Sequence, residues 1–208
     1  MSHRSRGLYR FLEIPAVYEH FQRLLGADAA RTRFVEEFLR PAPGARLLDI
    51  GCGTGSLLTY LPADVHYVGY DLNPAYIDAA RSRHGERGRF FCARVGAETT
   101  DLGTEQFDFV VAKGLLHHLS DDDAHHLLDV AGRVLARGGV FISSDNVFYD
   151  GQPLISRALT ALDRGGRVRR PEGYRALISS HFTEVEAQLV TDMLAFPYAH
   201  FIMRASKT

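Results

Sequence analysis

The most constraining feature of this chain is an apolar run that ends at an acid and then turns on three alternating glycines. The segment Leu47–Ser56 reads LLDIGCGTGS, with Gly51, Gly53 and Gly55 in the turn. Glycine permits backbone conformations that bring the main chain close to a ligand. A strand, a tight turn and a helix start in this order therefore predict a ligand-binding edge of an α/β sheet.

A second acid stands at the end of the next apolar run. Val65–Tyr70 precedes Asp71, which comes about 20 residues after Gly51. An acid at the tip of a neighbouring strand is placed to accept hydrogen bonds from both hydroxyls of a ribose. The weaker interpretation is a glycine turn beside an incidental surface acid.

These two segments, LLDIGCGTGS and VGYDLNP, closely resemble the class I S-adenosylmethionine (SAM) dependent methyltransferases. The segment 106–119 (QFDFVVAKGLLHHL) resembles the family's fourth-strand motif, and 134–140 (VLARGGV) resembles its turn before strand five. The glycine spacing is GxGxG, whereas the dinucleotide fingerprint GxGxxG aims a helix at a pyrophosphate, which SAM lacks. A nicotinamide oxidoreductase is therefore disfavoured. The resemblance covers residues 43–148 best.

The resemblance implies SAM as the cofactor and assigns its contacts. Asp71 would bind the ribose, and Asp49 would orient the loop and the methionine ammonium, which is compatible with capping of the glycine-turn amides. Many members carry an acid after the third strand for the adenine amino group, but Arg94 stands there and cannot accept a hydrogen bond. Backbone groups or a stacked guanidinium would replace that contact, or Arg94 points to solvent. The predicted cofactor-binding residues are Asp49, Gly51, Cys52, Gly53, Gly55, Asp71, Leu72, Ala93, Arg94 and Lys113.

Methyl transfer requires the nucleophile, the methyl carbon and the sulfur in line, so alignment supplies much of the acceleration. A hydroxyl or amine acceptor also calls for a base in some enzymes. The resemblance places candidate catalytic residues after strands four and five, namely Asp145, His117 and His118. Asp145 is the first candidate, although an Asx turn explains it equally well. For the histidines, capping or lining of the next helix is an equal alternative.

Apolar runs and helical repeats alternate along the chain. This alternation predicts an α/β fold, a doubly wound and mostly parallel sheet with helices on both faces. By resemblance the sheet has seven strands in a Rossmann-like arrangement and ends in an antiparallel hairpin whose last strand lies beside the fifth. The predicted strands are 46–50, 66–70, 89–93, 107–112, 140–144, 182–190 and 198–204. The predicted helices of the core are 55–61, 74–84 and 121–136.

We expect a single domain over 1–208, with an N-terminal helical lid (1–42), a SAM-binding core (43–148) and an acceptor-side insert with the closing hairpin (149–208). Aromatic residues of the lid would line the acceptor pocket, or amphipathic helices simply pack on the sheet edge. These residues are Tyr9, Phe11, Tyr18 and Phe21. Six arginines of the insert form either a clamp for an anionic acceptor or a solvated loop. They are Arg157, Arg164, Arg167, Arg169, Arg170 and Arg175.

Composition limits the partners and the location. A net charge of −1 gives no global attraction to nucleic acid or to an anionic membrane. Two cysteines, Cys52 and Cys92, are too few for a disulfide framework and are expected at buried positions, which indicates a reduced, cytoplasmic compartment. No apolar run approaches the ~20 residues of a membrane helix. His125 and His126 match no zinc spacing, so no metal is expected.

The sequence thus predicts a SAM-dependent methyltransferase that acts on a small molecule, one with an anionic group if the arginines act as a clamp, at oxygen, nitrogen or carbon. One alternative is a SAM-binding regulatory or partner protein that has lost catalysis. Another is an RNA or protein methyltransferase, which ranks lower because the fourth strand lacks an NPPY-type or DPPY-type motif and the charge is near neutral. Fold alone does not decide between them.

Overall fold

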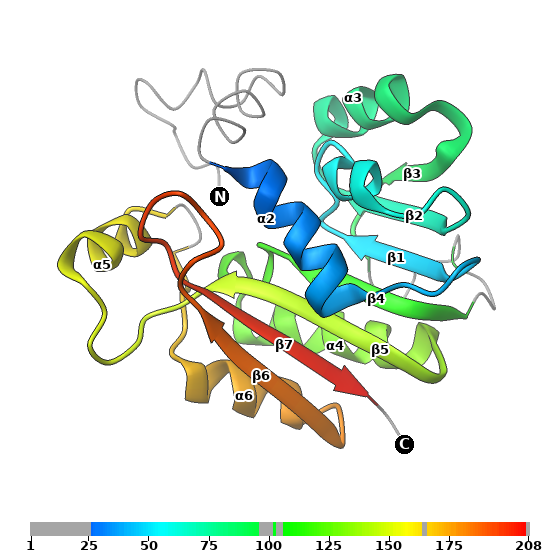
Figure 1. Cartoon of the computed structure of the whole chain (residues 1–208). Coiled ribbons are helices and arrows are strands. Elements are labelled where there is room, and N and C mark those ends of the chain that lie inside the picture. The colour runs from blue at the N-terminus through cyan, green and yellow to red at the C-terminus, as the bar shows by residue number, and fades with distance from the viewer. Residues whose placement is uncertain (1–25, 96–101, 103–105, 164–165, 207–208) are drawn as a thin grey trace.

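The computed structural model describes residues 26–95, 102, 106–163 and 166–206. A seven-stranded sheet forms its centre, in the order β3-β2-β1-β4-β5-β7-β6 (Figure 1). Neighbouring strands are parallel except that β7 runs antiparallel to both β5 and β6. The predicted fold class is confirmed, including the closing hairpin with its last strand beside the fifth.

The strands are β1 (Arg46–Ile50), β2 (His66–Asp71), β3 (Gly88–Cys92), β4 (Phe107–Lys113), β5 (Leu135–Asn146), β6 (Glu184–Val190) and β7 (His200–Ser206). The α-helices are α2 (Ala27–Arg33), α3 (Pro74–His84), α4 (Asp121–Val134), α5 (Leu154–Ala161) and α6 (Pro171–Ser179). A π-helix, η2 (Phe34–Leu39), continues α2, and the short 3-10 turns are η3 (Ser56–Tyr60), η4 (Gly85–Arg87) and η6 (Leu116–His118). Within the described residues, no helix is both long enough and apolar enough to cross a membrane.

Helices cover both faces of the sheet because its strands are apolar on both sides. In β1, Leu47 packs into a buried cluster with α2, η2, η3 and α3. Its neighbour Leu48 points to the opposite face and packs with α4 and α6. Both leucines are fully buried. The sheet is thus a two-sided core whose strand ends remain available for a site.

Helix starts follow local capping. Asn73 accepts hydrogen bonds from the first amides of α3, and Pro74 occupies the first helical position. Ser120 accepts the amide of Asp123 at the start of α4, whose first turn carries three aspartates. These features place both helices where the sequence predicts them.

Three local predictions need correction. The helix predicted over 55–61 is only the 3-10 turn η3, since Leu61 is extended as residues before proline usually are. Helix α4 ends at Val134 rather than at residue 136, and the next residue already has an extended backbone and opens β5. Cys92 is exposed, not buried, because β3 is an edge strand. The aromatic residues predicted for the lid, at positions 9, 11, 18 and 21, lie outside the described residues.

Helix α5 packs with its polar side inward. Ser156 and Thr160 are buried, and the side-chain amide of Gln152 donates to both hydroxyls at 3.0 and 3.1 Å. Leu154 and Ile155 on the opposite side are exposed. Hydrogen bonds therefore fix α5 where other helices are fixed by apolar packing. Asp163 follows this helix, and its backbone amide donates a hydrogen bond to the carbonyl of Thr160 in the last turn.

Gly139 sits where β4 and β5 come close together. A Cβ at this position would lie 2.9 Å from the carbonyl oxygens of Phe107 and Ala136, which are backbone atoms that cannot rotate away. We expect Gly139→Ala to lower the free energy of unfolding by about 1–3 kcal/mol, as overpacking does. Urea unfolding measures the change.

The matched control is Gly173→Ala in α6, where an added Cβ would meet only the flexible side chain of Arg169 at 3.5 Å. There the substitution should be neutral or stabilise by up to about 1 kcal/mol, since alanine favours helix. Equal destabilisation by both variants would contradict the steric argument.

Candidate functional site

A cavity of about 510 Å³ opens over the carboxyl ends of the central strands. Its lining includes the glycine loop after β1, Asp71 at the end of β2, Lys113 at the end of β4, and His117. A smaller cavity of about 220 Å³ adjoins it. The two share Arg31, Lys113, Ser144, Tyr198 and His200, so they form one cleft. This position, outside the carboxyl ends of parallel strands, is where open α/β sheets bind ligands.

The glycine loop presents bare backbone to the larger cavity. Gly51, Gly53 and Gly55 all have positive φ angles, of 77°, 55° and 69°. A Cβ at Gly55 would lie 2.8 Å from the Phe90 ring, whereas one at Gly53 would meet no atom within 4 Å. The loop is therefore held by packing on one side and open to a ligand on the other.

Asp71 ties the glycine loop to the end of β2. Its two carboxylate oxygens accept the amides of Gly53 at 2.9 Å and of Asn73 at 2.8 Å. The residue is only half-buried and lines the larger cavity. An ionised carboxylate has about four acceptor positions, so two remain for hydroxyl groups in the cavity.

Three ionisable side chains, those of Asp49, Cys52 and Lys113, lie under or beside the loop. Asp49 is 3% exposed and accepts the hydroxyl of Tyr67 at 2.6 Å, and burial raises its pKa to about 6. Burial also lowers the pKa of Lys113 to about 8. Cys52 is buried as predicted, and burial raises the pKa of its thiol well above the ordinary value, which disfavours the reactive thiolate.

The acceptor side of the cleft is built around His117. Its Nδ1 lies 2.8 Å from Oδ1 of Asp145, and its Nε2 lies 3.2 Å from Oδ1 of Asp163. Burial disfavours the charged imidazole, but the hydrogen bonds to these two carboxylates outweigh burial and raise the pKa of His117 to about 9. The hydroxyl of Tyr198 donates to Asp163 at 2.7 Å. The ring of His118 lies 4.2 Å from that of His117.

Asp145 does not stand at the mouth of the cleft, where the sequence suggested a base. It is 1% exposed, and Oδ1 also accepts the backbone amide of His117 at 3.2 Å. Its contacts with the Nδ1 atom and the backbone amide of His117 are those of a residue that orients the imidazole ring. Its part in catalysis, like those of His117 and His118, stays a prediction.

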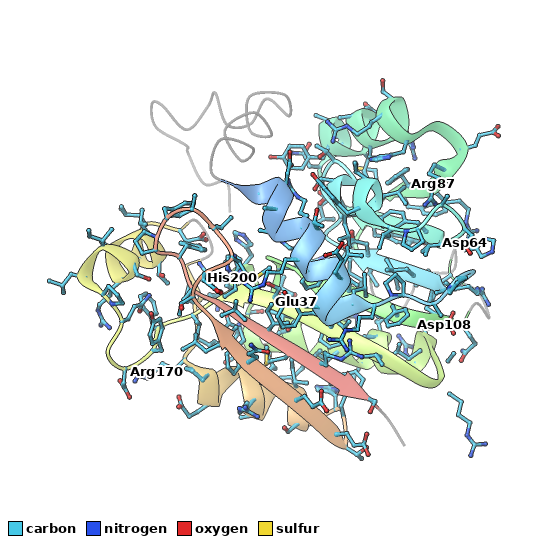
Figure 2. The ribbon with its side chains drawn as sticks, viewed as in Figure 1. Glu37, Asp64, Arg87, Asp108, Arg170 and His200 are labelled. Carbon is cyan, nitrogen blue, oxygen red and sulfur yellow. The ribbon has the colours of Figure 1, made fainter. Side chains whose placement is uncertain are left out.

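Other predicted contacts lie away from the cavities. Leu72 is 62% exposed, and the guanidinium of Arg94 pairs with Asp123 at 2.9 Å. Neither residue lines the described cleft, nor does Ala93, so their contacts with a cofactor stay predictions. Arg170 pairs with Asp150 at the periphery of the molecule (Figure 2).

The described arginines of the insert do not form the predicted clamp. None of those at 157, 167, 169, 170 and 175 lines either cavity. Arg169 instead donates to the carbonyls of Leu116 and Leu119 and pairs with Asp121. Arg169 therefore braces the segment around η6, and an anionic acceptor finds no support from the described arginines of the insert.

Sequence reasoning missed Arg31, Asp163 and Tyr198. Asp163 precedes a glycine-rich loop and Tyr198 precedes the last strand, so each carries a weak local signal. His200 lies at the start of β7, in the middle of the molecule (Figure 2). Its Nδ1 is buried with no hydrogen-bond partner among the described residues, and burial lowers its pKa to about 3.

Comparison with known proteins identifies the domain. The family model described as "Methyltransferase domain" matches residues 48–141, which hold the glycine loop, Asp71 and His117. Residues 48–141 are thus a methyltransferase domain, and this match and the fold support the class I SAM-dependent methyltransferases. A ubiquinone biosynthesis O-methyltransferase from Azorhizobium caulinodans is 39% identical over 111 residues, which cover 51% of this chain and 42% of that protein.

Two further proteins show the range of similar methyltransferases. A mouse protein named "Probable tRNA methyltransferase 9B" (Mus musculus) is 34% identical over 107 residues, which cover 50% of this chain and 23% of that protein. The structure of human N-acetylserotonin methyltransferase in complex with SAM shares the fold at 17% identity, with a TM-score of 0.66 over 97% of this chain and 58% of that one. This chain therefore spans less than half the length of these two curated relatives.

The cleft fits SAM, the cofactor of the class I SAM-dependent methyltransferases. The bare glycine backbone, the half-buried carboxylate of Asp71 and the cationic Lys113 and Arg31 all line the larger cavity. SAM is a nucleoside linked to an amino acid. The glycine backbone lets it approach closely, Asp71 can accept hydrogen bonds from its hydroxyls, and the two cations can bind its carboxylate. The volume of about 510 Å³ lies within the range of small-molecule sites.

The pKa of Asp49 predicts a pH effect on stability. The folded protein keeps this proton up to about pH 6, whereas the ordinary pKa is 3.8. The native state then binds more protons than the unfolded state between these values, so stability falls as the pH rises through them. Asparagine cannot ionise, so we expect the free energy of unfolding of Asp49→Asn to decrease less over this pH range, by up to about 3 kcal/mol.

Urea unfolding of both proteins between pH 4 and pH 7 measures this difference. The control is Asp64→Asn, which removes one acid at an exposed position. Identical pH dependence in the wild type and in Asp49→Asn would refute the raised pKa of Asp49.

Proposed function

We propose that this protein transfers the methyl group of SAM to a hydroxyl group of an apolar small molecule. The observation that carries the proposal is the divided cleft. Its larger cavity is walled by the glycine loop and Asp71, and the adjoining cavity is largely apolar. The O-methyltransferase relative from Azorhizobium supports oxygen as the acceptor atom.

In the cofactor half, Asp71 would accept the ribose hydroxyls of SAM and the glycine loop would lie along its backbone. Lys113 and Arg31 line the far side of the same cavity and would pair with the carboxylate of the methionine part. Asp49 lies behind the loop and would act on the cofactor through the field of its charge rather than by contact.

In the acceptor half, apolar side chains would hold the body of the acceptor. They are Ala27, Ala30, Met193, Leu194 and Phe196. The polar groups Tyr198 and His200 line both cavities, and His117 lines the larger one. An apolar wall with few polar groups is typical of sites for small molecules and fixes their orientation.

The reaction is an in-line displacement. SAM supplies a methyl group on a sulfonium, which is a good leaving group. The acceptor oxygen forms the new bond to the methyl carbon while the carbon–sulfur bond breaks and its electron pair returns to sulfur. The hydroxyl proton is released to solvent. His117, held by Asp145, would carry positive charge beside the oxygen and stabilise it as the proton leaves.

Two alternatives remain testable. The relative named as a tRNA methyltransferase makes RNA a second candidate acceptor, although the charge of −1 gives the chain little attraction to RNA. Incubation with SAM carrying a labelled methyl group, against small phenols and against tRNA, separates the two. Transfer to tRNA alone would overturn the proposal. SAM binding without transfer to any acceptor would favour the regulatory alternative.

Asp71→Ala tests the cofactor half. Loss of one or two charge-assisted hydrogen bonds should raise the Kd for SAM at least about 10-fold. Calorimetric titration measures the affinity, with circular dichroism to check folding. Asp78→Ala, an exposed acid in α3, is the matched control and should bind as the wild type does. Unchanged affinity in Asp71→Ala would reject the ribose assignment.

Asp145→Asn tests the positioning of His117. The shape is kept but the charge that holds the imidazole is lost, so kcat should fall about 10-fold or more while the Kd for SAM stays the same. Asp150→Asn, at the periphery, is the control. If Asp145 is only structural, SAM binding and turnover should fall together. Full turnover in Asp145→Asn would mean that Asp145 only forms the turn that ends β5.

A further inference from the structure

Three metal-ligating side chains meet in the cleft. They are His117 and His118 of η6 and Asp163 after α5, and one ligand atom from each lies within 4.8 Å of the other two. Two imidazoles and a carboxylate form a ligand set that zinc and other divalent transition metals favour. Nothing in the family motifs requires this grouping, because Asp163 comes from the insert, far from the glycine loop in sequence.

The orientation of His117 suits a metal ligand. Asp145 holds Nδ1 at 2.8 Å, which leaves Nε2 turned toward Asp163. Metal-binding histidines almost always donate their second ring nitrogen to a carboxylate or carbonyl in this manner, which fixes the tautomer and raises the basicity of the ligand. The supporting contact is therefore already formed.

The spacing of the ligand atoms also suits one ion. Nε2 of His117 and Oδ1 of Asp163 are 3.2 Å apart. Two ligands at about 2.0–2.2 Å from a zinc ion, in tetrahedral or five-coordinate geometry, are separated by about this distance. The ion would need little rearrangement of these two side chains.

The charge around His117 favours a cation. Two carboxylates, from Asp145 and Asp163, flank one imidazole. Oδ2 of Asp145 is buried and has no hydrogen-bond partner among the described residues. The charge of one imidazolium balances only one of these two carboxylates, so a divalent ion bound to Nε2 of His117 in place of its proton would stabilise the site further.

An ion here would be reachable from the larger cavity and would lie close to Tyr198, which donates to Asp163 and lines both cavities. His118 is exposed, and all three side chains line the larger cavity. Three protein ligands leave a position open, as in catalytic rather than structural zinc sites.

We propose that His117, His118 and Asp163 bind one divalent transition metal ion, with zinc as the preferred ion, and that the acceptor hydroxyl occupies its open position. The ion would act as a Lewis acid and make the hydroxyl proton leave more easily. The second part of the proposal rests on the proposed function, whereas the binding of the ion does not.

Binding of the metal alone is measured first. The full chain is treated with a chelator and titrated with Zn²⁺ by calorimetry and with Co²⁺ by visible absorption. We expect one ion per chain, with the affinity reduced about 10–100-fold or more in His118→Ala and Asp163→Asn, and about 10–100-fold in Asp145→Asn through loss of the supporting contact. His66→Ala, an exposed histidine in β2, should bind as the wild type does.

Absence of stoichiometric uptake, or uptake that His118→Ala and Asp163→Asn leave unchanged, would overturn the metal site. SAM titration of the same samples keeps this outcome apart from a failure of the proposed function. Once an acceptor is known, chelation should lower turnover and Zn²⁺ should restore it. Turnover that is indifferent to chelation would overturn the catalytic part and leave a bound ion with another role.

Discussion

The cleft depends on a small set of hydrogen bonds that fold the loop after β1 back onto the end of β2. The amides of Gly51 and Cys52 both donate to the carbonyl of Tyr70, and the amide of Gly53 donates to Asp71. Parallel strands leave their carboxyl ends without such cross-links, so these bonds convert two strand ends into one rigid wall. A Cβ at Gly69 would lie 2.8 Å from the sulfur of Cys52, so β2 must carry a glycine beneath the loop.

Several buried polar groups lie in or next to the wall of the cleft. Among the described residues, Ser144 Oγ, Asp145 Oδ2, Asn146 Oδ1 and His200 Nδ1 are buried with no hydrogen-bond partner. Each such group costs free energy, and most buried polar atoms in proteins are paired. All four belong to β5 or to the start of β7, and Ser144, Asn146 and His200 line the larger cavity. These atoms therefore lower the stability of the free protein, and a ligand in the cleft would supply hydrogen-bond partners to those that line it.

Much of the fold could be predicted because its signals are local. Apolar runs gave β1 its bounds, and Asn73 with Pro74 gave α3 its start. The glycine turn and Asp71 could be placed in one cavity because parallel strands end at the same edge. The family resemblance also brought His117 and Asp145 to neighbouring strand ends, although it did not show that one orients the other.

What the sequence could not show depends on tertiary contacts. Asp163 reaches His117 only because α5, which has an inward polar side against the usual amphipathic rule, ends close to the cleft. Tyr198 joins them because β7 runs antiparallel and begins beside the cleft. Neither arrangement follows from spacing along the chain, since each brings together residues from separate elements.

The interior position of β7 has a consequence for how the chain becomes competent during synthesis. Ser206, at the end of this strand, pairs with Val140 on one side and with Glu184 on the other. Until β7 has been made, β5 and β6 are unpaired edges that could join other chains. Tyr198 and His200 enter the cleft in the same step. The sheet is thus closed and the cleft completed in the same step. A ligand that fills both cavities would therefore bind only to chains in which β7 is in place.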